Sequence, residues 1–320
     1  MFFKIIHTTL LLLISFQLAS TESLHLEFPS VDDASEFASL SNAIYDLDSC
    51  DDDVLPDNIV CYWYDEKSDG TQYMILISGE SEYIAVVYAG TYSIDDIMVD
   101  MDIDLVQYDG PNPNNDKILV HEGFNDVLFS NGVWNELFPI VYTLHQTYPD
   151  YRLITSGHSL GGAEAIMTAT ALAYTLPDSN VISISYGTPK IGDESWVSFA
   201  NSISNLAIWR FVNGEDIIPR HPKYDYMHVG HTIQLNERCV KAYYLHYGDE
   251  SLDYSGIPSD WDATFPTYTS LQKHKSGSYA EYVNQKSSME PKRYYVSKFS
   301  EMRGYFDNIF WWKQQSYDEC

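Results

Sequence analysis

The stretch that most limits how this chain can fold is residues 151–174, which read YRLITSGHSLGGAEAIMTATALAY. A short apolar, β-branched run at its start indicates a strand, and the apolar residues from Ala163 onward recur at helical spacing. Between them, residues 157–161 form a G-x-S-x-G pattern, whose glycines permit a sharp turn that holds a serine in a strained conformation. The sequence therefore predicts a strand, a tight turn at Ser159 and a helix.

Such a turn has the geometry that acyl transfer needs. It lifts the hydroxyl of Ser159 clear of the sheet, and the following helix aims free N–H groups and a positive dipole end at any oxyanion formed there. The alternative is a glycine-rich turn with an incidental serine. The strand before the turn and the helix after it favour a nucleophile.

Strands and helices alternate along the rest of the chain, which predicts an α/β fold with a mostly parallel central sheet flanked by helices. Apolar runs predict strands at residues 59–64, 73–77, 83–88, 118–120, 181–186 and 206–212, and helices at residues 32–45 and 127–147. A mature length of about 300 residues suits one large α/β domain as well as two small ones, and we expect a single domain as the simpler arrangement.

The first 20 residues read as a secretory signal peptide, with Lys4, an apolar core and small residues at Ala19 and Ser20. A membrane anchor is the competing interpretation, but the apolar stretch is shorter than the roughly 20 residues that cross a bilayer. No later segment is apolar enough for a transmembrane helix. We therefore expect a secreted, extracellular protein with one domain over residues 21–320, including an aromatic C-terminal extension at about 285–320.

The chain carries 18 basic and 46 acidic residues, a net charge of −28. Such a surface disfavours binding to nucleic acid and electrostatic docking to anionic lipid. Aspartates cluster at residues 51–53 and 100–104, but neither run continues into the glycine and distal glutamate of an EF-hand loop. The sequence predicts no metal and no cofactor.

Four cysteines, Cys50, Cys61, Cys239 and Cys320, are an even number in a chain that we expect to be exported. Two disulfides are the expected arrangement, and three pairings are open; four buried thiols are the alternative. No Asn-x-Ser/Thr sequon is present, so N-glycosylation is not expected.

A nucleophilic serine needs an imidazole to take its proton and a carboxylate to orient that imidazole. In α/β-hydrolase folds the order is serine, then acid, then histidine. Asp216 follows the strand at residues 206–212 through a turn and is the predicted acid. The alternative is an ordinary aspartate of a turn, which would show the same sequence pattern. His274, in a late polar loop, is the predicted base, and His246 remains the alternative.

An oxyanion hole needs two N–H donors. The first is the N–H of Leu160, which follows the nucleophile, and the second comes from a loop after an early strand. Gly90 ends the strong strand at residues 83–88 and would let the chain turn so that the Thr91 N–H lies beside Ser159. A simple loop glycine is the alternative.

Five segments together resemble the fungal-type, or class 3, lipase family. They are VYAGT at 87–91, VHEGF at 120–124, ITSGHSLGGA at 154–163, YGTPKIG at 186–192 and NGEDIIP at 213–219. The resemblance implies an α/β-hydrolase-like mixed sheet, a nucleophile at Ser159, an acid at Asp216 and oxyanion donors at Thr91 and Leu160. The same resemblance assigns the catalytic base to His274 less directly. The chain departs from the family at Ala89, where arginine is common, and at Glu164, where a small or apolar residue is usual.

The resemblance also implies a short lid helix after the oxyanion residue, and residues 93–100 read SIDDIMVD. Ile94, Ile97 and Met98 fall on one helical face, aspartates interrupt them, and Ser93 can cap the helix. An ordinary surface helix is the alternative. As a lid, the segment would cover the site in water and open at a lipid surface.

The sequence thus predicts a secreted serine hydrolase of carboxylic esters, with acylglycerol lipids as the expected substrates and transient contact with a lipid interface. A feruloyl-esterase-like or phospholipase activity is the main alternative, because the motifs describe chemistry and not the acyl group. The other alternative is a non-catalytic lipid-binding protein of the same fold. The aromatic extension at 285–320 packs on the domain or contacts lipid. The oligomeric state stays open, with a monomer as the default.

Overall fold

The computed structural model describes residues 29–50, 55–91, 104–113, 117–213, 216–222, 225–235 and 240–243. Several sequence-based expectations lie outside these ranges. They concern the signal peptide, the lid residues Ile94, Ile97 and Met98, the histidines His246 and His274, the cysteines Cys239 and Cys320, and the extension at 285–320.

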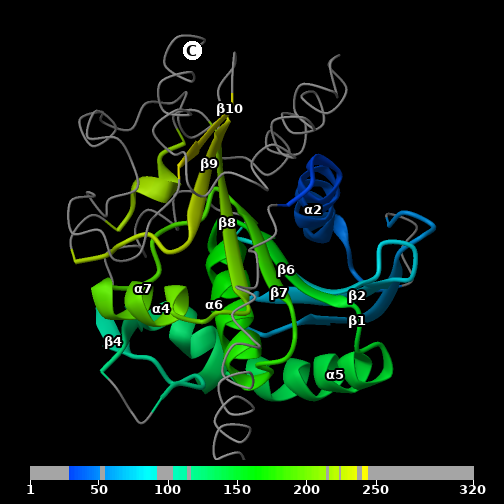
Figure 1. Cartoon of the computed structure of the whole chain (residues 1–320), viewed down its shortest axis with the longest axis horizontal. Coiled ribbons are helices and arrows are strands. Elements are labelled where there is room, and N and C mark those ends of the chain that lie inside the picture. The colour runs from blue at the N-terminus through cyan, green and yellow to red at the C-terminus, as the bar shows by residue number, and fades with distance from the viewer. Residues whose placement is uncertain are drawn as a thin grey trace, which may run out of the picture.

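A sheet of eight strands, in the order β1-β2-β3-β6-β7-β8-β9-β10, forms the centre of the described part of the chain (Figure 1). Its strands are β1 (Val60–Glu66), β2 (Gln72–Ser78), β3 (Tyr83–Tyr88), β6 (Arg152–His158), β7 (Val181–Tyr186), β8 (Leu206–Asn213), β9 (His231–Leu235) and β10 (Val240–Tyr243). The five strands from β3 to β9 run parallel, and the outer pairs β1–β2, β2–β3 and β9–β10 are antiparallel. The mostly parallel sheet expected from the sequence is confirmed.

Helices cover both faces of this sheet (Figure 1). The helices are α2 (Val31–Ala43), α4 (Glu122–Asn125), α5 (Val133–Thr147), α6 (Leu160–Thr175) and α7 (Glu194–Asn201). Apolar residues of α5, α6 and α7 share one core with one face of the sheet, and α2 packs on the other face in a second core. Burial on both sides explains the continuous apolar run of β3, and β7 is likewise buried at every position.

Local signals explain where two of these helices begin. Ser30 caps α2, because its hydroxyl accepts a hydrogen bond from the Asp33 N–H at 2.9 Å. Asp193 caps α7 in the same way, accepting from the N–H groups of Ser195 and Trp196. An ion pair between Arg152 Nη1 and Asp33 Oδ2, at 3.0 Å, then fixes the start of α2 against the first residue of β6.

The single helix expected over residues 127–147 is wrong in its first part. A π-helix occupies Asp126–Ser130, directly after α4, and α5 begins only at Val133. Gly132 separates the two with φ of 84°, a left-handed conformation that ends one helix and lets the chain turn into the next. A short antiparallel pair, β4 (Leu105–Gln107) and β5 (Leu119–His121), lies outside the main sheet.

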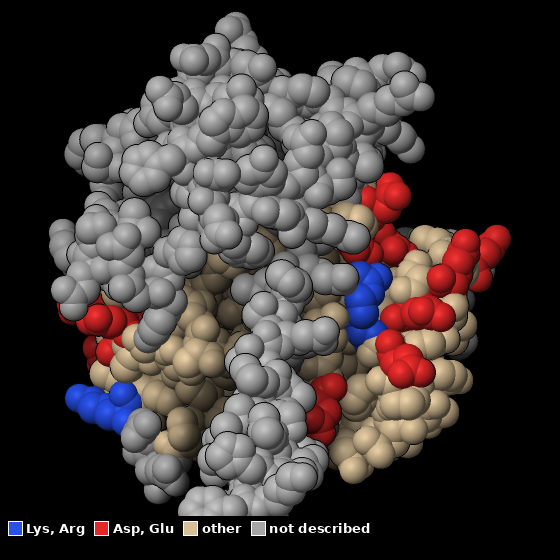
Figure 2. Space-filling model, viewed as in Figure 1, with Lys and Arg blue, Asp and Glu red and all other residues tan. Residues whose placement is uncertain are grey.

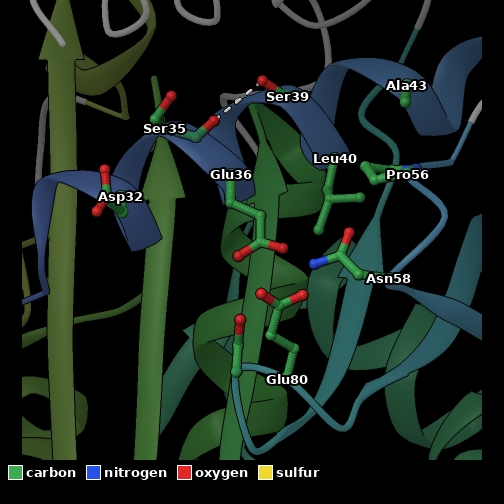
Figure 3. Close-up of a pocket in the computed structure, with 10 residues that line it drawn as sticks. Asp32, Ser35, Glu36, Ser39, Leu40, Ala43, Pro56, Asn58 and Glu80 are labelled. Atoms are coloured by element: carbon green, nitrogen blue, oxygen red, sulfur yellow. Dashed lines mark hydrogen bonds between the residues drawn. The ribbon is translucent and has the colours of Figure 1, made fainter.

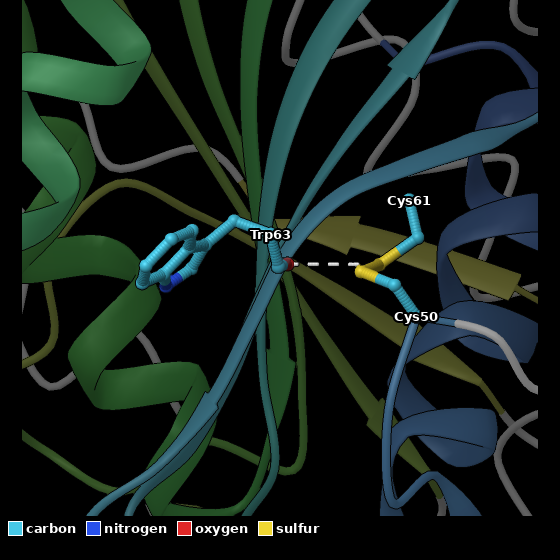
Figure 4. Close-up of a disulfide and its surroundings, with 3 residues drawn as sticks. All are labelled: Cys50, Cys61 and Trp63. Carbon is cyan, nitrogen blue, oxygen red and sulfur yellow. Dashed lines mark hydrogen bonds between the residues drawn. A yellow bond between two sulfur atoms is a disulfide. The ribbon is translucent and has the colours of Figure 1, made fainter.

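Cys50 and Cys61 form a disulfide, which selects one bond among the pairings that the sequence left open (Figure 4). The bond joins the segment after α2 to β1, the edge strand of the sheet, and closes a loop with a sequence separation of 11. Cys61 Sγ also lies 3.6 Å from the carbonyl oxygen of Trp63. The disulfide thus links β1 to the segment that follows α2.

Among the charged side chains visible on the described surface in Figure 2, acidic ones prevail over basic ones, and most of them lie on the side of α2, β1 and β2. This agrees with the net charge of −28. Among the described helices, none combines the length and the apolar character that a bilayer span requires.

Candidate active site

Ser159 lies at the sharp turn between β6 and α6, as the sequence predicts. Its φ of 58° and ψ of −126° are unusual for a residue with a side chain, and such strain is characteristic of a nucleophile elbow. The Ser159 N–H donates to the carbonyl of Tyr186 at 2.9 Å, which ties the turn to the end of β7. Leu160 is the first residue of α6, so its N–H has no acceptor within the helix and points out of the helix end.

Glycine at position 161 lets the elbow approach the neighbouring strand. A Cβ on Gly161 would lie 2.5 Å from the carbonyl oxygen of Ala89 and 2.7 Å from that of Tyr88. Both oxygens belong to backbone, which cannot yield as a flexible side chain does. The packing of α6 against the end of β3 therefore requires the second glycine of the G-x-S-x-G pattern.

The end of β3 lies directly beside the nucleophile. A Cβ on Gly90 would come within 3.1 Å of the Ser159 Cβ and 2.5 Å of the His158 carbonyl oxygen. Thr91 follows immediately, is exposed, and is the last described residue before the predicted lid. The structure thus brings the proposed oxyanion segment and the nucleophile together, as the parallel pairing of β3 with β6 requires.

A tyrosine that sequence reasoning missed links these two segments. Tyr45 lies in the 3₁₀ turn Ile44–Asp46 after α2. Its hydroxyl oxygen is 2.9 Å from the Gly90 nitrogen and 2.9 Å from Nδ1 of His158. A tyrosine near the end of a helix carries no sequence signal for this contact, which spans 113 residues to His158.

Asp216 is fully buried just beyond β8. Its Oδ1 accepts a hydrogen bond from the Ile218 N–H at 2.9 Å, so the carboxylate is anchored within its own turn. The carboxyl ends of β3, β6, β7 and β8 meet at one edge of the sheet because these strands run parallel. Asp216 and Ser159 therefore follow strands that end at the same edge, two positions apart in the strand order.

A buried arginine and histidine brace the turn that carries Asp216. The His228 Nε2–H donates to the Pro219 carbonyl at 2.6 Å, and Arg210 Nη1 donates to Nδ1 of the same ring at 2.8 Å. These two partners require a neutral imidazole with its proton on Nε2. Burial and the nearby charge of Arg210 lower the pKa of His228 well below its ordinary value, which agrees with that state.

Glu164, one turn inside α6, is buried in the core next to β3. Its Oε2 has no hydrogen-bond partner among the residues that the structure describes. Burial raises the pKa of this carboxyl to about 8, with a smaller contribution from the charge of Asp69. The neighbouring Tyr88 hydroxyl lies 2.8 Å from the Thr168 hydroxyl instead. A neutral acid thus occupies the position where the family commonly has a small or apolar residue.

A polar pocket of about 440 Å³ lies at the opposite end of the sheet, between α2 and the turn that precedes β3 (Figure 3). The carboxylates of Glu36 and Glu80 point toward one another across it, near the amide of Asn58. Burial raises the pKa of Glu36, and the Tyr83 hydroxyl donates to its Oε1 at 3.0 Å. Among the described residues, no three His, Cys, Asp or Glu side chains come together as a metal site would require.

Comparison with known proteins finds one family that part of the chain resembles. The family described as Lipase (class 3) matches residues 85–226, a range that includes Gly90, the elbow and Asp216. The matched segment contains the described candidate residues except Tyr45, which precedes it.

Two curated relatives illustrate what this chain is similar to. A lipase of Rhizomucor miehei is 29% identical over 212 residues, which cover 64% of this chain and 54% of that protein. A secreted alkaline triacylglycerol lipase of Penicillium cyclopium is 33% identical over 144 residues, which cover 43% of this chain and 48% of that protein. The chain thus spans about half the length of the curated relatives that it matches.

Solved structures of fungal lipases share the fold. A lipase of Rhizopus microsporus var. chinensis superposes with a TM-score of 0.58 at 22% identity, covering 70% of this chain and 83% of that one. A triacylglycerol lipase of Penicillium expansum gives 0.57 at 24% identity, covering 67% and 82%. A further triacylglycerol lipase, described as having a serine protease triad as its catalytic centre, gives 0.58 at 24%, covering 65% and 81%. These likenesses confirm the α/β-hydrolase type of fold.

Proposed function

We propose that this chain is a member of the class 3 lipase family and a secreted serine hydrolase that cleaves carboxylic esters of acylglycerol lipids. The observation that carries the proposal is the strained turn at Ser159, with Gly90 against its Cβ and Asp216 anchored beyond β8. Strain of this kind persists only where the surrounding structure maintains it. The named relatives, among them a secreted triacylglycerol lipase, support both the reaction and the extracellular setting.

The mechanism assigns one role to each residue. Ser159 Oγ attacks the ester carbonyl while His274 takes its proton, and Asp216 orients and stabilises the imidazolium. The N–H groups of Thr91 and Leu160 bind the oxyanion of the tetrahedral intermediate. Its collapse breaks the bond to the alcohol, which leaves with the proton from His274. Water then attacks the acyl-enzyme by the reverse proton route and releases the acid.

The lid belongs to the same proposal. Only Tyr92 separates residues 93–100 from Thr91 in the sequence, so a helix there would lie at the entrance to the site. Its apolar face, with Ile94, Ile97 and Met98, would cover Ser159 in water and meet acyl chains at a lipid surface. Hydrolysis of an emulsified ester should then rise abruptly above the solubility limit, and Ile97→Asp should abolish that rise while sparing soluble short-chain esters.

A substrate panel tests the function. The purified protein is assayed on p-nitrophenyl esters of increasing chain length, emulsified triglyceride, phospholipid and methyl ferulate. Preferred release of fatty acid from triglyceride supports the proposal. Preferred hydrolysis of phospholipid would change the proposed substrate class from triglyceride to phospholipid. One relative, 30% identical over 105 residues, is named phospholipase A1-IIbeta, from Arabidopsis thaliana. An absence of hydrolysis on every ester would refute it and favour a non-catalytic lipid-binding protein.

The triad histidine has its own test. His274→Ala should reduce turnover as severely as loss of the nucleophile, whereas His246→Ala should act only through stability. The reverse result would move the base to His246 and leave the reaction class unchanged.

A further inference from the structure

The hydroxyl of Tyr45 connects the two segments that a nucleophile and an oxyanion hole must keep in register. It lies 2.9 Å from the Gly90 nitrogen, at the end of β3, and 2.9 Å from His158 Nδ1, immediately before the nucleophile. These two distances are typical of good hydrogen bonds. A residue from the start of the fold thus bridges β3 and β6 where the two strands reach the site.

The Tyr45 hydroxyl can take part in both bonds at once. A backbone N–H can only donate, so Gly90 donates to the Tyr45 oxygen. The same hydroxyl has a second acceptor site and one proton, so it pairs with His158 Nδ1 in either tautomer of the ring. One side-chain oxygen therefore joins the backbone of Gly90 to the ring of His158.

Gly90 cannot move without disturbing the site. The space at its Cα is limited by the His158 carbonyl oxygen and by the Ser159 Cβ, which a Cβ on Gly90 would approach to 2.5 and 3.1 Å. Thr91, whose N–H is the proposed oxyanion donor, is the next residue. A donor contributes to catalysis only when it is held where the oxyanion will form, because reorganisation at the moment of reaction costs energy.

We propose that Tyr45 is a positioning residue for this hydrolase, holding Gly90 against His158 so that the Thr91 N–H stays aligned with the oxyanion on Ser159. This inference rests on the proposed function. It assigns Tyr45 no contact with substrate. Its effect is therefore on turnover and on binding of a transition-state mimic, and not on binding of the ground-state ester.

Tyr45→Phe removes the hydroxyl and keeps the ring. Steady-state hydrolysis of soluble p-nitrophenyl butyrate should show kcat lowered about tenfold, with KM changed less than about twofold. An alkyl trifluoromethyl ketone, which adds to the serine hydroxyl and forms an oxyanion, should show an inhibition constant raised by a similar factor. A residue with a purely structural role would not change these two quantities in parallel.

Tyr64→Phe is the matched control. The Tyr64 hydroxyl donates to the Leu47 carbonyl at 2.8 Å, so its loss also removes one hydrogen bond to the segment that follows α2. That bond does not involve Gly90 or His158. The control should lower the melting temperature without changing kcat or the inhibition constant.

A second variant tests the other end of the bridge. His158→Phe removes the ring nitrogen that pairs with the Tyr45 hydroxyl and should lower kcat and weaken binding of the ketone in the same way. This variant keeps the test valid if Tyr45→Phe fails to fold. A folded Tyr45→Phe protein with unchanged kcat and inhibition constant would overturn the positioning role. Wild-type protein without any esterase activity would instead refute the proposed function itself.

Discussion

The buried carboxyl of Glu164 makes the stability of this protein depend on pH. The pKa of this group rises from 4.5 to about 8 because burial disfavours its charged form. Below pH 4.5 both the folded and the unfolded chain hold the proton. Between pH 4.5 and 8 the unfolded chain releases the proton and the folded chain keeps it, so the free energy of unfolding falls as pH rises.

The size of this effect follows from the pKa difference. Each pKa unit corresponds to about 1.4 kcal/mol. A rise from 4.5 to about 8 therefore costs roughly 3 kcal/mol at pH 7 and approaches about 5 kcal/mol above pH 8. Glu164→Gln keeps the size of the side chain and cannot ionise. Its free energy of unfolding, relative to the wild type, should thus increase by about 1 kcal/mol per pH unit from pH 5 to pH 8.

Urea unfolding followed by tryptophan fluorescence at pH 5, 6, 7 and 8 measures this difference. Glu194→Gln is the matched control, because it removes one negative charge from the exposed first turn of α7. The control should differ from the wild type by an amount that does not change with pH. A difference between Glu164→Gln and the wild type that stayed constant within about 0.5 kcal/mol across the range would refute the reasoning.

Two further substitutions test the packing around the site. Gly161→Ala should destabilise the protein by about 3 kcal/mol, because its Cβ would lie 2.5 Å from the Ala89 carbonyl oxygen. The control Gly79→Ala meets only an ordinary contact at 3.7 Å and should cost little. Equal melting temperatures for the two variants would contradict this. His228→Leu should lower the free energy of unfolding, measured in urea, by about 2 to 3 kcal/mol, because it removes the acceptor of a hydrogen bond from buried Arg210. A decrease below about 0.5 kcal/mol would show that this hydrogen bond does not stabilise the fold.

The sequence predicted those parts of the fold whose signals are local. The strands β3, β6 and β7 are short apolar runs bounded by polar turns, and the change of period across residues 157–161 located the elbow. The parallel pairing followed from the alternation of strands and helices. Asp216 was chosen as the candidate acid because the order of residues in an α/β-hydrolase fold limited the search to the end of a later strand, and its catalytic role stays a prediction.

Other features depend on contacts between distant residues, which one sequence does not reveal. Tyr45 meets His158 across 113 residues, and no periodic pattern marks that contact. Cysteine spacing left three pairings open until the structure joined Cys50 to Cys61. The break at Gly132 had a local signal in the preceding Ser130 and Asn131, but the helical period on either side outweighed it.

Labelling of the nucleophile tests the central claim most directly. An alkyl fluorophosphonate is reacted with the wild-type protein, and tryptic peptides are read by mass spectrometry while ester hydrolysis is followed in parallel. The account predicts one phosphonate per wild-type chain, attached to Ser159, and a loss of activity in proportion to labelling. The Ser159→Ala variant should take up no label, and its turnover should be about 10⁶-fold lower than that of the wild type. Labelling at another residue, or Ser159→Ala activity within tenfold of the wild type, would contradict it.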